Sequence, residues 1–173
     1  MYISIDSFKK NNIECNWRTL YVGLELHLIT NIDITNYAIE FLANHPEINN
    51  QDIIQLAWGG DEYDPKDLLE NILKDLEDTS SYINFEKRKW RFCILESLKK
   101  EYENDIQELL DKVAEVYADF NYPEDMENFV NYLSSKDGYI PSQHTKEENV
   151  ARLIKFLNDF LKKEHNYLLT FCS

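Results

Sequence analysis

The residues best suited to chemistry in this chain gather in the stretch WGGDEYDP, residues 58–65. It contains two of the four glycines of the chain, an aromatic residue on each side of them, and three carboxylates. A glycine pair can hold a phosphate, whereas carboxylates can bind a metal ion or transfer protons. The same stretch can also be a turn between two helices, so the surrounding residues must distinguish a binding site from a turn.

The order of the residues in this stretch argues against a phosphate or metal site. A phosphate loop places its glycines directly before a helix, together with Lys, Ser or Thr, but here acidic residues fill that gap and would repel an anion. The acidic spacing matches no calcium loop either. We therefore predict that Gly59 and Gly60 end one helix, that Asp64 and Pro65 begin the next, and that the loop between them is exposed.

The other patterns of catalytic residues are missing from the sequence. There is no phosphate-binding P-loop, dinucleotide fingerprint, HExxH, EF-hand loop or GxSxG elbow. The four histidines never lie three or four residues apart, and the three cysteines form no CxxC pair. His27 is expected to be a partly buried core residue. The sequence thus predicts a protein that is not an enzyme and that has no metal site and no cofactor.

The elements that position these residues are predicted to be helices, because apolar side chains recur at spacings of three and four residues through nearly the whole chain. Only MYISI and YLLTFC, at the two ends, resemble strands, and they could pair into a small β-ribbon. We predict an all-α, single-domain bundle of about six to eight helices over residues 1–173. The expected helices are 16–29, 34–44, 50–58, one from Pro65, one long or two abutting helices over 84–119, 123–134, and 146–165 after a Thr145/Glu148 capping box.

Charge is the strongest global signal. The chain has 173 residues, of which 43% are apolar, and it carries 32 Asp and Glu against 18 Lys and Arg, a net charge of −14. Such a chain can bury a core, but it repels nucleic acid and anionic membranes and favours a cationic partner. No apolar stretch has the ~18 residues of a membrane span, and no leader pattern is seen, so a cytoplasmic protein is expected.

The acidic residues are concentrated in two segments. Residues 47–78 and 96–128 each carry a net charge of −8, whereas EKRKWR, residues 86–91, is net +3. Acidic side chains on outer helix faces can be merely solvated, but two such segments repel themselves, and a basic partner would relieve that repulsion. Tyr63 and Tyr122 are candidate aromatic anchors. The predicted partner-binding residues are Asp61, Glu62, Tyr63, Asp64, Asp119, Tyr122, Glu124 and Asp125.

Two stretches also resemble a known group of proteins. NWRTLYVGLELHLITNIDITNYAIEFL (16–42) and IIQLAWGGDEYDPKDLLENIL (53–73) are similar to a family of small, acidic, helical bacterial proteins found among the immunity proteins of polymorphic and contact-dependent growth-inhibition toxins. The resemblance covers the first half of the chain. It implies a cytosolic antitoxin that occludes the active site of a cognate toxin domain, often a nuclease. The family has no catalytic motif, and its toxin-contacting residues vary, so none can be transferred.

Two other classes of function remain open at this stage. An α-helical hydrolase could use Mg²⁺ bound by carboxylates, for which Glu101 with Asp105, or Asp64 with Asp67, have the spacing of one helix face. A regulatory scaffold that binds a protein other than a toxin is the third class, and composition does not separate it from an immunity protein.

Overall fold

The computed structural model describes the backbone of residues 2–60, 62–74 and 79–171, and the side chains of all of these except 79–81 and 171. The described chain forms eight α-helices and two short 3-10 helices, which confirms the all-α prediction. It divides into two compact units, residues 1–90 and 91–173. The expectation of a single domain over residues 1–173 stays a prediction.

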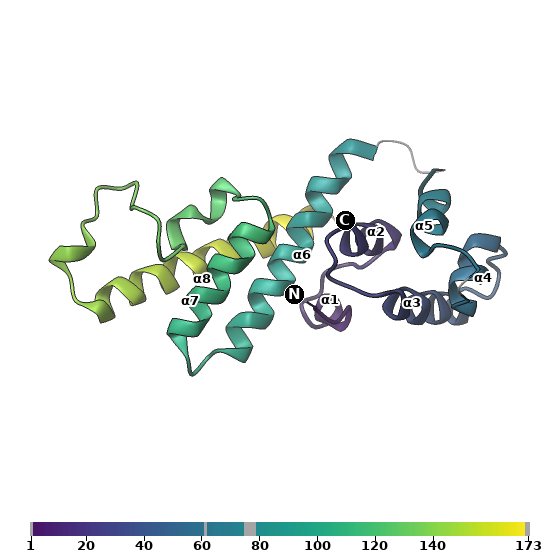
Figure 1. The fold of residues 1–173 in the computed structure, drawn as a ribbon, viewed down its shortest axis with the longest axis horizontal. Coiled ribbons are helices and arrows are strands. Elements are labelled where there is room, and N and C mark those ends of the chain that lie inside the picture. The colour runs from purple at the N-terminus through teal and green to yellow at the C-terminus, as the bar shows by residue number, and fades with distance from the viewer. Residues whose placement is uncertain (1, 61, 75–78, 172–173) are drawn as a thin grey trace. The chain divides into compact units, whose positions relative to one another are not determined.

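The first unit contains α1 (Asp6–Lys10), α2 (Trp17–Glu25), α3 (Asn31–Asn44), α4 (Gln51–Trp58), α5 (Pro65–Lys74) and the first half of α6 (Thr79–Glu101) (Figure 1). Helix α4 packs against α3 and α5, and α5 packs against α2. Side-chain caps start several of these helices: Asn16 accepts a hydrogen bond from Thr19 N, and Asn50 accepts one from Ile53 N. Capping satisfies backbone N–H groups that a helix cannot satisfy internally.

The core of the first unit is built around Trp90, which is fully buried. Its ring meets Phe8 edge to face at 4.6 Å, and its Nε1 donates to Thr19 O at 2.8 Å. A Cβ added to Gly23 would lie 2.3 Å from Trp90 Cζ2, so glycine is what allows α2 to approach this ring. Other fully buried residues of this core are Leu20, Ile34 and Leu69.

The second unit contains the rest of α6, α7 (Ile106–Asp119), the 3-10 helices η1 (Glu124–Phe129) and η2 (Pro141–Gln143), and α8 (Lys146–Phe171) (Figure 1). Helix η1 packs against α8. Of the two alternatives predicted for residues 84–119, one long helix or two abutting helices, the structure has two helices, α6 and α7. Asp105 caps α7 by accepting a hydrogen bond from Glu108 N at 3.1 Å. The buried side chains of this unit include Leu95, Leu109, Leu110, Val113, Val116, Met126, Phe129, Leu157 and Leu161.

Three expectations about the elements are wrong. No strand occurs in the described part of the chain, so the terminal β-ribbon is not formed. Residues 167–171 instead continue α8. The helix continues because Leu161, Glu164 and Leu168 are buried at helical spacing and no Gly or Pro stops it. The predicted 123–134 helix is replaced by η1, since Met126 and Phe129 are buried three residues apart, the period of a 3-10 turn. His27 is exposed with φ +54°, just after α2 ends at Glu25.

Candidate partner-binding site

The glycine pair ends α4 as predicted. Gly59 has a left-handed backbone, φ +66°, and its N–H donates to Gln55 O at 3.4 Å. A Cβ at Gly59 would lie 3.1 Å from Thr35 Cγ2, so a side chain there would be both strained and crowded. The chain then starts α5 with Pro65, preceded by Asp64, whose Oδ1 accepts from Lys66 N at 2.9 Å. The stretch is therefore a helix–turn–helix connection.

The acidic side chains of this turn face solvent. Asp61 lies outside the described residues, but Glu62, Tyr63 and Asp64 are all exposed. No described Lys or Arg forms an ion pair with Glu62 or Asp64. The nearest Lys along the chain, Lys66, instead binds Glu25 Oε1 at 2.7 Å, and this hydrogen bond raises the pKa of Lys66. Two carboxylates of this turn are thus left unneutralised.

A groove opens beside this turn. It has a volume of about 410 Å³ and lies between the start of α3, the end of α4 and the start of α5. The polar side chains of Asn31, Thr35 and Gln55 line it, and Glu62 and Asp64 supply its charge. The groove therefore combines neutral hydrogen-bonding groups with a net negative charge.

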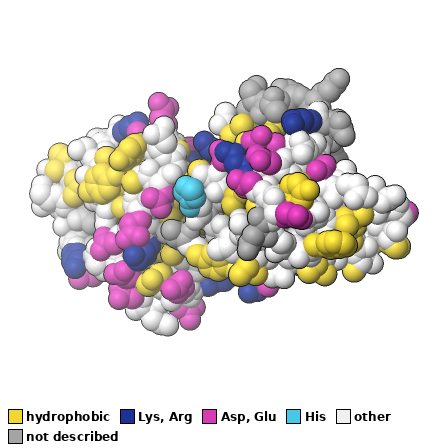
Figure 2. Space-filling model, turned by 45° about the vertical axis from the view of Figure 1, so that its right-hand side comes forward, with side chains coloured by type: hydrophobic (Ala, Val, Ile, Leu, Met, Phe, Trp, Pro, Cys, Tyr) yellow, Lys and Arg dark blue, Asp and Glu magenta, His cyan; other side chains and the backbone are white. Residues whose placement is uncertain are grey.

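Two aromatic side chains of the same connection are exposed. Trp58, the last residue of α4, is 79% exposed, and Tyr63, which lines the groove, is 53% exposed. On the face shown in Figure 2, hydrophobic and acidic side chains lie interspersed. Trp58 is absent from the predicted site residues, although the sequence contains the signal: it lies two residues after buried Leu56, about 200° around the helix and off the buried face.

The second predicted segment, residues 119–125, belongs to the second unit. Asp119 ends α7 and is exposed, as is Glu124 at the start of η1. Tyr122 is 59% exposed with φ +58°, and its ring meets Tyr117 edge to face at 5.3 Å. A positive φ is uncommon for a bulky residue, and here Tyr122 N closes the end of α7 by donating to Tyr117 O at 2.8 Å.

Asp125 differs from its neighbours because it already has a partner inside the protein. Its two carboxylate oxygens accept from Arg91 Nη1 and Nη2 at 2.8 and 2.6 Å, and Arg91 is only 5% exposed. Buried Glu164 of α8 lies 3.6 Å from the same guanidinium. Asp125 thus neutralises a buried cation, and an external partner would have to compete with Arg91.

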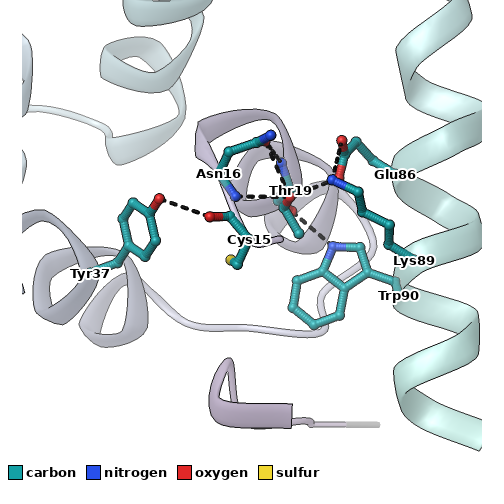
Figure 3. Close-up of polar contacts among 7 residues, drawn as sticks. All are labelled: Cys15, Asn16, Thr19, Tyr37, Glu86, Lys89 and Trp90. Carbon is teal, nitrogen blue, oxygen red and sulfur yellow. Dashed lines mark hydrogen bonds and ion pairs between the residues drawn. The ribbon is translucent and has the colours of Figure 1, made fainter. Parts of the chain in front are cut away.

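The basic segment 86–91 is largely internal, which its charge pattern did not reveal. Lys89 is 1% exposed and pairs with buried Glu86 at 3.0 Å, while Thr19 Oγ1 donates to Glu86 Oε2 at 2.7 Å (Figure 3). Nearby in Figure 3, the Tyr37 hydroxyl donates to Cys15 O at 3.0 Å, and burial raises the pKa of Tyr37. A cue in the sequence is that Trp90 and Phe92 alternate with these basic residues. The contacts of Glu86 with Thr19 and Lys89 link α2 to α6 and stabilise the fold.

The described residues offer little for metal chemistry. They contain no group of three or more His, Cys, Asp or Glu side chains that could hold a metal ion. Glu101 ends α6 and Asp105 precedes α7, so this pair does not share one helix face. Asp64 caps α5, and Asp67 is exposed in its first turn. None of the helices described is both long and apolar enough to cross a bilayer.

Comparison with known proteins gives one finding. No curated protein and no solved structure matches this chain. The model of one family, described as "Uncharacterized protein conserved in bacteria (DUF2247)", matches residues 5–165, which include both predicted acidic segments. The chain belongs to this family of proteins conserved in bacteria.

Proposed function

We propose that this protein is an immunity protein, an antitoxin that binds a cognate bacterial toxin domain and occludes its active site. The observation that carries the proposal is the exposed connection between α4 and α5, where two aromatic rings accompany two carboxylates that have no described basic partner. Exposed aromatic residues are the commonest anchors of protein interfaces, and unpaired carboxylates select a basic surface. The resemblance of residues 16–42 and 53–73 to immunity proteins supports the same conclusion.

The expected toxin domain is a basic nuclease. A nuclease binds its polyanionic substrate with Lys and Arg, so an acidic protein can cover that surface by imitating the charge of the substrate. Complementary charge would raise the association rate constant toward ~10⁸ M⁻¹s⁻¹ at low salt, while desolvated aromatic anchors would slow dissociation. The proposed mechanism is steric and electrostatic occlusion, and the chain itself performs no reaction.

Co-expression tests the proposal. The reading frame directly upstream is expected to encode a large secreted protein that ends in a small basic domain. That domain should arrest growth when expressed alone, and the present chain should restore growth and co-purify with it in a stoichiometric complex. Survival that needs no complex, or no protection at all, would exclude the immunity function.

Variants test whether the α4–α5 connection is needed for protection against the toxin. Trp58→Ala combined with Glu62→Lys removes an exposed ring and reverses an unpaired charge, so the complex should weaken by more than ~100-fold and protection should fail. The control is Asp159→Lys, a charge reversal at an exposed residue of α8. Both variants should keep the helical circular dichroism of the wild type, because none of the three residues is buried. Failure of the control alone would place the interface elsewhere.

A further inference from the structure

We propose that the groove beside the α4–α5 connection receives an arginine side chain of the protein partner. This inference rests on the proposed function, since it states which chemical group of the partner the groove binds. Three features support it: the charge that surrounds the groove, the Tyr63 ring in its lining, and the shape of the cation that fits both.

The charge around the groove comes from its carboxylates. Glu62 and Asp64 line it, and no other described lining residue is charged. Helix α4 ends at the groove, whereas α3 and α5 begin there, so the partial charges of the helix ends have both signs and the carboxylates supply the net negative charge. A cation entering the groove therefore meets two carboxylates.

The exposed ring of Tyr63, which lines the groove, suits the same kind of ligand. A guanidinium over the face of Trp or Tyr is attracted by the ring quadrupole. Described arginines of this chain already make such contacts with aromatic rings: Arg152 lies 4.2 Å from the centre of the Tyr139 ring, Arg18 lies 4.8 Å from that of Tyr82, and Arg91 lies 5.2 Å from that of Phe160. The Tyr63 ring has no such described cation of its own.

Arginine fits better than a metal ion or lysine. The described lining holds two carboxylates, and its other polar side chains are those of Asn31, Thr35, Gln55 and Tyr63. No group of three or more His, Cys, Asp or Glu that could hold a metal ion occurs among the described residues. A guanidinium has five N–H donors in one plane, enough to bind a carboxylate and amide oxygens together while its face stacks on a ring. Lysine has a compact ammonium that stacks poorly and is more strongly hydrated.

The experiment uses the full chain labelled with ¹⁵N and a blocked tripeptide, acetyl-Gly-Arg-Gly-amide, as the probe. The amide signals of Gly59, Gly60, Glu62 and Tyr63, which line the groove, should shift saturably. The matched peptide with lysine in place of arginine should bind at least about fivefold more weakly, because it loses planar donors and stacking. Equal binding of the two peptides, or shifts spread over the surface without saturation, would overturn the proposal.

A pair of isosteric variants tests the charge requirement. Glu62→Gln with Asp64→Asn removes both charges but leaves a side-chain oxygen at residue 64 to cap α5, so the fold should persist and arginine-peptide binding should fall by about tenfold or more. Glu147→Gln with Asp159→Asn makes the same change at two exposed residues of α8 and should leave binding unaltered. Binding that survives the first double variant would refute the groove as the site.

The two proposals fail in different ways. If the chain neutralises the toxin but the arginine peptide does not bind the groove, the immunity function stands and the arginine site is wrong. If the peptide binds the groove but the chain neither protects cells nor forms a complex, the chemistry of the groove stands and the immunity function is wrong.

Discussion

Asp125 and Glu124 are adjacent acidic residues with opposite roles in the fold. Asp125→Ala leaves the buried guanidinium of Arg91 without its two-point partner, so the free energy of unfolding should fall by about 2 kcal/mol, with Glu164 offsetting part of the loss. Glu124→Ala should change it by less than ~0.5 kcal/mol, because Glu124 is exposed. Urea denaturation of both variants measures the difference. Equal stabilities would show that Arg91 does not need Asp125.

Gly23 and Gly60 form a second matched pair. Gly23→Ala places a methyl group against the ring of Trp90, and overpacking of this kind costs about 1–3 kcal/mol. The Cβ of Gly60→Ala would meet only the backbone N of Glu62, at 4.0 Å, so this change should be tolerated. Thermal melting compares the two variants. An unchanged melting temperature in Gly23→Ala would mean that α2 can move away from Trp90 at little cost.

At the scale of elements, the start of α8 is held by a capping box. Thr145 N donates to Glu148 Oε2 at 2.9 Å, and Glu148 N donates to Thr145 Oγ1 at 3.2 Å. The hydrogen bond from Thr145 N–H is the main cause that lowers the pKa of Glu148 below its ordinary value of 4.5. A lowered folded pKa contributes stability that is fully present above the unfolded value and is lost as the pH falls through the folded value.

Glu148→Ala should therefore lower the melting temperature at neutral pH, and the difference from wild type should narrow as the pH falls below 4.5. Glu147→Ala is the control, since Glu147 lies in the same first turn and is exposed. Its effect should be smaller at neutral pH. Melting curves recorded from about pH 7 to about pH 3 test this expectation, and a Glu148→Ala deficit that stays constant down to the lowest pH would contradict it.

At the scale of the whole molecule, 32 Asp and Glu face 18 Lys and Arg, so internal ion pairs leave an excess of carboxylates and a net charge of −14. Added salt shortens the Debye length to about 8 Å at physiological ionic strength and screens the remaining repulsion. The melting temperature should therefore rise from low to moderate NaCl at neutral pH. The rise should shrink near pH 4, where carboxylates titrate. A flat response at neutral pH would show that repulsion among the excess carboxylates does not limit stability.

The sequence by itself determined the features that depend on neighbours along the chain. The helical period, the helix end at Gly59, the start of α5 at Pro65 and the capping box of α8 follow from local geometry, because each involves residues within about one turn of one another. The same local logic predicted an exposed acidic turn at 61–64, of which the described Glu62, Tyr63 and Asp64 are exposed.

Only the tertiary structure decided which of these residues already have partners. Asp125 and Arg91 are 34 positions apart, and Thr19 and Glu86 are 67 apart, so no local pattern reports that they meet. The groove likewise needs α3, α4 and α5 in place before its lining residues converge. A count of charges along the chain treats every carboxylate alike. Packing, however, leaves Glu62 exposed and places Asp125 against a buried cation. The two residues differ because burial and pairing depend on neighbours in three dimensions.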